Sequence, residues 1–212
     1  YGDAGSDTLG NLAAAVGGLE VPQLAALGLG NVHEISGVVP AAVPLAAHGR
    51  LQELSAGKDS TTGHWELVGV VTDRPFPTYP HGFPDAVIAE FERRTGYGVL
   101  GNKAASGTEI IAELGDEHLA TGKLIVYTSA DSVFQIAAHD RVCSVPELYR
   151  VCEIAREMLA PPHQVSRVIA RPFTGRSGAY ERTADRHDYS VAPPPGLLLP
   201  LLSDQGVEVA AI

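Results

Sequence analysis

The sequence predicts an α/β protein in which a second, α+β module is inserted into one discontinuous domain. Two proline-rich segments support this prediction, because clustered prolines interrupt helices and strands and are typical of places where a chain crosses between domains. Residues 74–80 contain three prolines, and three more lie at 193–195. Between these segments, amphipathic helical patterns alternate with strand-like apolar runs. We therefore expect residues 75–190 to form the inserted module, and residues 1–74 and 191–212 to form one α/β domain that is incomplete in this chain.

The first part of the chain predicts short helices separated by glycines. Residues 8–16 have an apolar helical pattern, preceded by a polar residue that can cap the helix and followed by two glycines. Residues 21–27 carry a proline in the first turn and end before another glycine, which predicts a second short helix. We expect irregular chain at 38–49, a polar loop at 58–63, and a mixed helical or extended segment at 64–71.

The middle of the chain predicts helices and strands in alternation. In residues 85–95 the apolar side chains recur on one helical face and the charged ones on the other. Residues 106–114 predict another helix, since Ser106 and Glu109 have the spacing of a capping box. The remaining predictions are a helix at 146–159, strands at 124–128, 133–138, 167–173, 180–182 and 189–191, an apolar helix at 196–202 and a terminal strand at 207–212.

The charge balance disfavours some classes of partner. With 15 basic and 25 acidic residues, the chain has a formal net charge of −10, which disfavours nonspecific binding to nucleic acids and to anionic membranes. No apolar run approaches the roughly 18 residues of a membrane-spanning helix. Residues 167–186 nevertheless contain five arginines and only two acids. Such a stretch favours a specific small anion, because the guanidinium offers a bidentate fork to phosphate or carboxylate. The alternative is that these arginines pair with nearby acids on a strand surface.

A short segment rich in hydroxyl groups is the first candidate for chemistry. Residues 57–65 contain three hydroxyl side chains, a lysine, an aspartate and a histidine in a glycine-flanked setting. A loop of this kind that leads into a helix can expose a hydroxyl nucleophile beside an activating group. The order of the residues differs from that of a P-loop. The alternative is a capping turn in which serine and threonine hydroxyls bond to backbone N–H groups.

Other polar residues leave their roles open. Residues 128–132 could hold sugar hydroxyls or cap their own turn. Asp59 and Asp131 could act as a paired acid and base if the fold brings them together. Three histidines lie beside an acid or a hydroxyl but lack the spacing of a metal site, so this chain alone does not predict one. These are His64, His139 and His187.

The two cysteines and the two ends of the chain predict its setting. Cys143 and Cys152 fit no metal-binding or disulfide pattern and are expected to be ordinary buried or partly buried thiols. Because no secretory signal pattern is present, we expect a reducing, cytoplasmic location. The chain lacks an initiator methionine, begins in a Gly/Asp loop and stops on a strand-like run. We therefore expect it to be an internal piece of a longer protein.

Six segments of the chain resemble a known family when they are taken together. Gly-Lys-Asp-Ser-Thr-Thr-Gly-His-Trp-Glu stands at 57–66, and Arg-Val-Ile-Ala-Arg-Pro-Phe stands at 167–173. The other segments are 1–11, 101–111, 125–139 (with Tyr-Thr-Ser-Ala-Asp-Ser) and 182–189. In this order and with this spacing they resemble the phosphopentomutases of the alkaline phosphatase superfamily. Residues 57–66 resemble the nucleophile loop of that family.

The resemblance implies a fold, a reaction and cofactors. The fold would be an incomplete alkaline-phosphatase-like core, residues 1–74 and 191–212, with an inserted α+β cap or substrate-binding domain at 75–190. The reaction would be an isomerase reaction in nucleoside salvage and catabolism. It would interconvert ribose 1-phosphate and ribose 5-phosphate, and the deoxyribose pair, through a phosphoenzyme and a sugar bisphosphate. The family uses two divalent metal ions, usually manganese, whose ligands lie outside residues 1–212, so this chain alone is expected to be inactive.

The resemblance also assigns site residues. Ser60 occupies the position of the family's nucleophile, which is usually a threonine, and keeps the hydroxyl. The substrate contacts carried over by position are Ser129, Asp131, Arg167, Ile169 and Arg182. The partners would be small-molecule pentose phosphates, without nucleic acid or membrane, and no oligomeric state is implied. The alternatives are another metal-dependent phosphotransferase or mutase of the superfamily, and a non-catalytic sugar-phosphate-binding fragment.

Overall fold

A computed structural model of the chain describes residues 4–57 and 59–210. Lys58, which is part of the predicted nucleophile loop, lies outside the described residues. So do residues 1–3 and 211–212, which belong to the first matching segment and to the predicted terminal strand. None of the helices within the described ranges is long and apolar enough to cross a membrane.

The chain divides into two compact units, Tyr1–Glu53 and Leu54–Ile212. The helices of the first unit are α1 Thr8–Val16, α2 Pro22–Leu27 and α3 Leu29–Val32, which pack around a small apolar core. Asp7 caps α1, since its Oδ1 accepts the Gly10 N–H at 3.0 Å. The two predicted helices are confirmed to within one residue. The single turn of α3 has no counterpart in the predictions, because four residues are too few to show a helical period.

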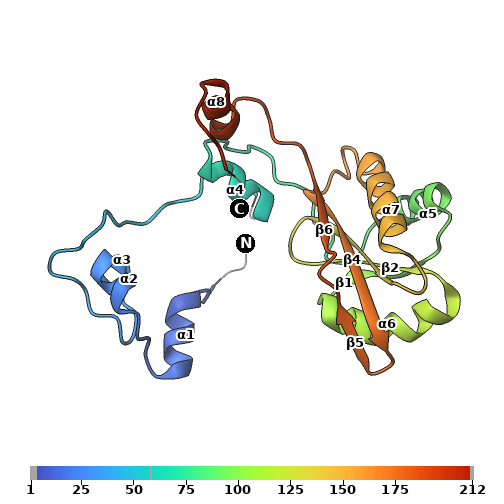
Figure 1. The fold of residues 1–212 in the computed structure, drawn as a ribbon, viewed down its shortest axis with the longest axis horizontal. Helices are drawn as coiled ribbons and strands as arrows, with labels where there is room; N and C mark the ends of the chain where they lie inside the picture. Colours follow the sequence, from blue (N-terminus) through green and yellow to red (C-terminus); the bar gives the residue numbers. More distant parts are fainter. Residues whose placement is uncertain (1–3, 58, 211–212) are drawn as a thin grey trace. The chain divides into compact units, whose positions relative to one another are not determined.

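The second unit contains a mixed sheet of six strands with helices beside it (Figure 1). The strands are β1 Val99–Ala104, β2 Leu124–Thr128, β3 Val133–His139, β4 Arg167–Arg176, β5 Ala179–Arg182 and β6 His187–Ser190. The helices are α4 Ser60–Leu67, α5 Asp85–Thr95, α6 Gly107–Thr121, α7 Val145–Met158 and α8 Leu198–Asp204. The pairs β1–β2 and β3–β4 are parallel, whereas β2–β3, β4–β5 and β4–β6 are antiparallel. The predicted mixture of helices and strands is confirmed.

Each face of this sheet has its own apolar core, because successive side chains of a strand point to opposite faces. On one face, strand residues such as Val126 and Phe134 pack against α5 and α7. On the other face, Ile125 and Tyr127 pack against α6 through Ile110. Figure 1 shows α5 and α7 on one side of the sheet and α6 on the other.

Strand β4 places two predicted site residues, Arg167 and Ile169, on the α6 face, together with Arg171. Arg167, Ile169 and Arg171 alternate with buried residues that belong to the opposite core. Helix α6 covers this face near Phe173, through the second core. Near Arg167 the same face lines a cavity.

Two elements of the sheet layer differ from the predictions. The helix predicted at 106–114 continues to Thr121, past Gly115, where the missing side chain leaves room for the Tyr180 ring. Its N-cap Ser106 makes no capping hydrogen bond through its side chain, so the predicted capping box is wrong. Strand β1 was not expected, because two residues near its centre have positive φ and interrupt the strand pattern. These are Gly101 at +90° and Asn102 at +46°.

Two predictions near the ends of the second unit are also wrong. The polar loop predicted at 58–63 is helical from Ser60 onward. The terminal strand predicted at 207–212 has no regular structure in residues 207–210. In contrast, α5 begins and ends where it was predicted, and both proline-rich segments are free of helix and strand, as expected. The division of the chain at those segments stays a prediction.

Candidate functional site

The hydroxyl-rich segment is the N-terminus of helix α4. Asp59 is the N-cap, and its Oδ1 accepts the backbone N–H groups of Thr61 and Thr62 at 3.0 and 3.1 Å. Its Oδ2 accepts the Thr62 hydroxyl at 2.7 Å. A capping turn, the alternative given by the sequence, is therefore present, but the group that caps the helix is the Asp59 carboxylate and not a serine or threonine hydroxyl. Asp59 and both threonines are buried, whereas Ser60 is exposed.

Ser60 lies next to residues from distant parts of the chain. Its Oγ donates to Asp131 Oδ2 at 3.4 Å, and Arg167 Nη2 donates to the same oxygen at 3.3 Å. Asp131 lies in the turn before β3 and Arg167 begins β4, so the parallel pairing of these strands brings them together. Asp59 has both oxygens in the helix cap, and the structure shows no contact between it and Asp131 among the described residues. The pairing of these two carboxylates as acid and base is not supported.

Arg167 is held by two carboxylates. Its Nη1 donates to Asp188 Oδ2 at 2.9 Å, beside the contact with Asp131. Arg186 donates to both oxygens of Asp188 at 2.7 Å. Burial favours the neutral form of Asp188, but the hydrogen bonds and charges of Arg186 and Arg167 outweigh burial and lower its pKa. The Arg167 Nε is buried without a hydrogen-bond partner among the described residues, so one donor of this guanidinium is unused.

A cavity of about 430 Å³ lies over this part of the sheet. Five of the six predicted site residues line it: Ser60, Ser129, Asp131, Arg167 and Ile169. It is also lined by Gln135, Arg171, Arg186 and the first residues of α6, which the sequence reasoning did not single out. Arg171 could have been found from the alternation of β4, because every second residue from Arg167 shares one face. A neighbouring cavity of about 340 Å³ shares Ser60 and Arg167.

Arg182, the sixth predicted residue, lies at the end of β5. It is exposed and pairs in register with Phe173 of β4. It does not line the 430 Å³ cavity. Its charge nevertheless acts on the buried Tyr127: burial raises the pKa of the Tyr127 phenol, and the charges of Arg171, Arg182 and Arg186 oppose that rise.

The turn at 128–132 contains one side chain that bonds across the turn and two that line the cavity. The Thr128 hydroxyl donates across the turn to the Val133 carbonyl oxygen at 2.8 Å, whereas the Ser132 hydroxyl donates to the carbonyl oxygen of Pro77, in the first proline-rich segment, at 2.5 Å. Ser129 and Asp131 instead line the cavity. The turn is therefore fixed partly by its own bond and partly by the Pro77 segment, and it presents one hydroxyl and one carboxylate to the cavity.

Only one of the three histidines lies at the site. The His64 Nδ1 is 2.6 Å from the Ser60 carbonyl oxygen, and the ring lines the smaller cavity. His139 is buried, with its Nε2 3.2 Å from the carbonyl oxygen of Gly175. His187 packs against the ring of Tyr149, with 5.3 Å between the ring centroids. The last two are structural residues in this fold.

The described residues provide no metal centre. No group of three or more His, Cys, Asp or Glu side chains in residues 4–57 and 59–210 could hold a metal ion. Both cysteines are free and buried, as predicted. Burial raises the pKa of Cys143 to about 11, which disfavours a reactive thiolate. The side chains that the described residues bring to the cavity include a hydroxyl, a carboxylate and arginines.

Comparisons with known proteins find relatives along the entire chain. No protein-family model matches it. The phosphopentomutase of Clostridium novyi is 53% identical over 212 residues, which is all of this chain and 54% of that protein. The phosphopentomutases of Desulfitobacterium hafniense and Symbiobacterium thermophilum are 55% and 57% identical, again over the whole chain and over 55% and 54% of their own lengths. The chain is homologous to phosphopentomutases. It spans about half the length of the phosphopentomutases that it matches, and the resemblance inferred from its sequence is confirmed.

Proposed function

We propose that this chain carries the nucleophile and the substrate-binding residues of a phosphopentomutase, an isomerase that interconverts the 1-phosphate and the 5-phosphate of ribose or deoxyribose. The observation that carries the proposal is the meeting of Ser60, Asp131 and Arg167 at one cavity. The names of its relatives support the same activity. The reaction would belong to nucleoside salvage and catabolism in the cytoplasm.

In this proposal Ser60 carries the phosphoryl group. Phosphorylated Ser60 passes that group to the free hydroxyl of a pentose monophosphate: the bond from serine Oγ to phosphorus breaks as the bond from the sugar oxygen forms. The proton of the sugar hydroxyl ends on the serine oxygen, so the step balances. The sugar bisphosphate then returns its other phosphoryl group to Ser60. Because Ser60 is the first residue of α4, the backbone dipoles of that helix favour the negative charge.

The remaining cavity residues would position the sugar. Arg167 offers unused donor capacity to a phosphate, since its Nε has no hydrogen-bond partner among the described residues. Ser129 and Asp131 can hydrogen-bond to ribose hydroxyls. Ile169 gives the sugar an apolar surface on the same strand face. Arg182 would add charge at the rim of the site, for the substrate phosphate.

The described residues contain no set of ligands for the metal ions of the proposed reaction. The two divalent ions, Mn²⁺ in the resemblance, would neutralise charge on phosphoryl oxygens. The described side chains do not fit them, and their ligands are expected outside residues 1–212. We propose residues 1–74 and 191–212 as part of the catalytic core and 75–190 as the cap, and we expect the chain by itself to bind pentose phosphates without turnover.

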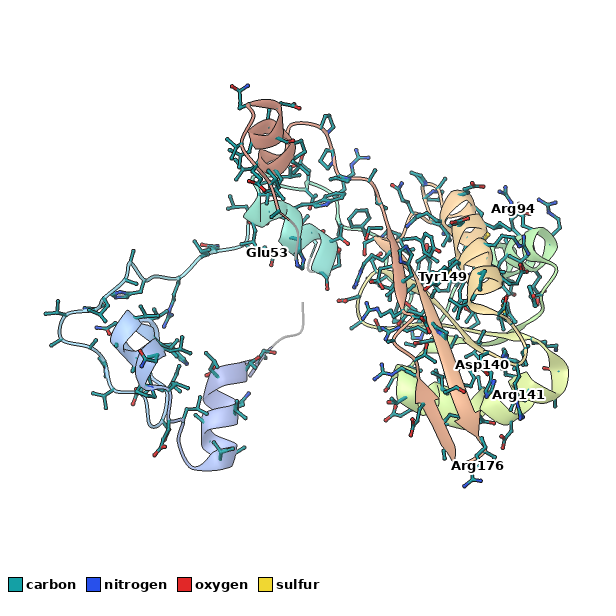
Figure 2. The ribbon with its side chains drawn as sticks, in the orientation of Figure 1. Glu53, Arg94, Asp140, Arg141, Tyr149 and Arg176 are labelled. Carbon is teal, nitrogen blue, oxygen red and sulfur yellow. The ribbon has the colours of Figure 1, made fainter. Side chains whose placement is uncertain are left out.

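Calorimetric titration tests this proposal on the 212-residue chain. Ribose 5-phosphate is expected to bind, and ribose without phosphate is expected to bind far more weakly. Arg167→Ala should weaken binding about ten- to a hundredfold, because one charge-assisted phosphate contact contributes roughly 1.5–3 kcal/mol. The matched control is Arg176→Ala, at the exposed far end of the same strand (Figure 2). Equal affinities for the wild type and a folded Arg167→Ala variant would contradict the proposal and leave Arg167 as an ion-paired surface arginine.

A further inference from the structure

A buried hydroxyl attaches the turn that carries Asp131 to the first proline-rich segment. The Ser132 hydroxyl donates to the Pro77 carbonyl oxygen at 2.5 Å, across 55 positions of the chain. Ser132 is 1% exposed, so the bond lies in a low-dielectric setting where it is stronger than in water. Because each proline ring fixes one φ angle, the segment that contains Pro75, Pro77 and Pro80 is stiff. A bond at Pro77 therefore holds the neighbouring residues of the segment as well.

The same segment contacts the helix that begins with Ser60. The Phe76 ring packs edge-to-face on Trp65 of α4, with 5.8 Å between the ring centroids and 66° between the ring planes. Phe76 directly precedes Pro77, so adjacent residues of the segment contact α4 and the turn. The Ser60 hydroxyl in turn donates to Asp131 of that turn. These contacts form a closed ring that runs from Ser60 along α4, through the proline-rich segment and the turn, and back to Ser60.

The Ser132 backbone makes a separate connection, to the start of β4. Its carbonyl oxygen accepts the Ser166 N–H at 2.9 Å and the Ser166 hydroxyl at 2.8 Å. Ser166 directly precedes Arg167, so these bonds hold the turn beside that arginine. Without its hydroxyl, residue 132 would keep both bonds, and would lose the Pro77 bond and a longer contact of 3.3 Å from the Ser166 N–H. The turn and Arg167 would then stay together, while the proline-rich segment would lose its attachment.

We propose that Ser132 is a positioning residue for the phosphoryl transfer. Its hydroxyl holds the proline-rich segment, and through that segment it holds α4, so that Ser60 meets a sugar bound at Asp131. This inference rests on the proposed function and adds a residue that does not itself line the 430 Å³ cavity. In a transfer between groups on separate elements, a misplacement of about 1 Å can slow the reaction roughly a hundredfold. Ser132 therefore acts on the rate of transfer, while the sugar-binding residues keep their places.

Steady-state kinetics test this role in a full-length protein that contains this chain, with ribose 5-phosphate as the substrate. Ser132→Ala should lower kcat about ten- to a hundredfold and leave KM within about twofold of the wild type. The matched control is Ser166→Ala. Ser166 is 0% exposed and its hydroxyl also donates to a backbone carbonyl group, but that bond does not involve the proline-rich segment. The control should lower the thermal midpoint about as much as Ser132→Ala does, and should keep kcat within about twofold of the wild type.

A second measurement follows the segment itself, on the 212-residue chain and without substrate. Trp65 is the only tryptophan in the sequence and packs against Phe76, so its fluorescence reports on this contact. Acrylamide should quench Trp65 more strongly in Ser132→Ala than in the wild type or in Ser166→Ala. In the full-length protein, Phe76→Ala should break the same connection. Ser132→Ala combined with Phe76→Ala should therefore be no slower than the slower single variant.

The outcomes separate this inference from the proposed function. If the wild type is active and Ser132→Ala keeps its kcat, the positioning role is overturned and the proposed function stands. Equal losses of kcat in Ser132→Ala and Ser166→Ala, or effects of Ser132→Ala and Phe76→Ala that multiply, would also overturn the positioning role. Unchanged quenching of Trp65 in Ser132→Ala would overturn the attachment of the segment. A folded full-length wild type that does not turn over ribose 5-phosphate overturns the proposed function, and the positioning role with it.

Discussion

At the scale of single residues, three adjacent hydroxyls at the start of α4 have different environments. Thr62 is fully buried and donates to Asp59, Thr61 is buried, and Ser60 is exposed beside Asp131. Their order along the chain does not distinguish them, because any of the three could be the exposed hydroxyl of a loop. The helix cap distinguishes them, since it turns Thr62 toward Asp59 and leaves Ser60 exposed beside Asp131.

We expect Ser60→Ala, in a full-length protein that contains this chain, to abolish both mutase turnover and phosphorylation. Thr62→Val should leave the phosphorylation site intact but lower the free energy of unfolding by about 1–3 kcal/mol, because the buried Asp59 loses a donor. Phosphopeptide mapping, steady-state rates and chemical denaturation measure these effects. A phosphopeptide mapped to Thr61 or Thr62, or phosphorylation retained in Ser60→Ala, would refute the assignment.

At the scale of elements, helix α6 is tied to the sheet through a buried histidine. His118 Nε2 accepts the His139 backbone N–H at 2.8 Å, and its Nδ1 contacts the Lys123 carbonyl oxygen. Nε2 must therefore be unprotonated, so His118 fits this site only as the neutral ring. Burial lowers the pKa of His118 below its ordinary value of 6.5, although the Lys123 carbonyl opposes the shift.

The sign of the pH dependence follows from this lowered pKa. Above about pH 6.5 the ring is neutral in both the folded and the unfolded chain, so this contribution to stability is constant. As the pH falls below 6.5, the unfolded chain binds a proton that the folded chain does not, and stability is lost. We expect His118→Gln to flatten the dependence of unfolding free energy on pH between about 5 and 7, whereas His81→Gln, at an exposed site, should not. Identical slopes in the wild type and His118→Gln would show that His118 is not the titrating group.

The elements show what the sequence could predict and what it could not. Helix α5 was predicted at its observed ends because a regular amphipathic pattern lies between Pro84 and Gly96. Strand β1 was missed because Gly101 and Asn102 have positive φ and interrupt its pattern; the register with β2 shifts at Asn102, whose side chain bonds to the backbone of Phe83 instead. The resemblance supplied Ser60 as a candidate. Its contact with a carboxylate 71 residues away depends on strand pairing, which periodicity does not reveal.

At the scale of the whole molecule, apolar burial is concentrated in one region. Both cores of the second unit are built from side chains between Tyr79 and Tyr189. Among the residues that the structure describes, the core of Tyr1–Glu53 has three buried members, and α8 buries none. Because buried apolar area is the main favourable term in folding, the region between the two proline-rich segments should hold most of the stability.

We therefore expect an excised 75–190 fragment to unfold in a single cooperative thermal transition, with a midpoint close to that of the 212-residue chain. Its length is normal for one domain, and every strand of the sheet and both cores are retained. An excised 1–53 fragment is the comparison, and its three-residue core should give no cooperative transition. Calorimetric scans of both fragments measure this difference. If 75–190 melts without cooperativity, the inserted domain needs the flanking segments to fold, and the boundaries predicted from the prolines are wrong.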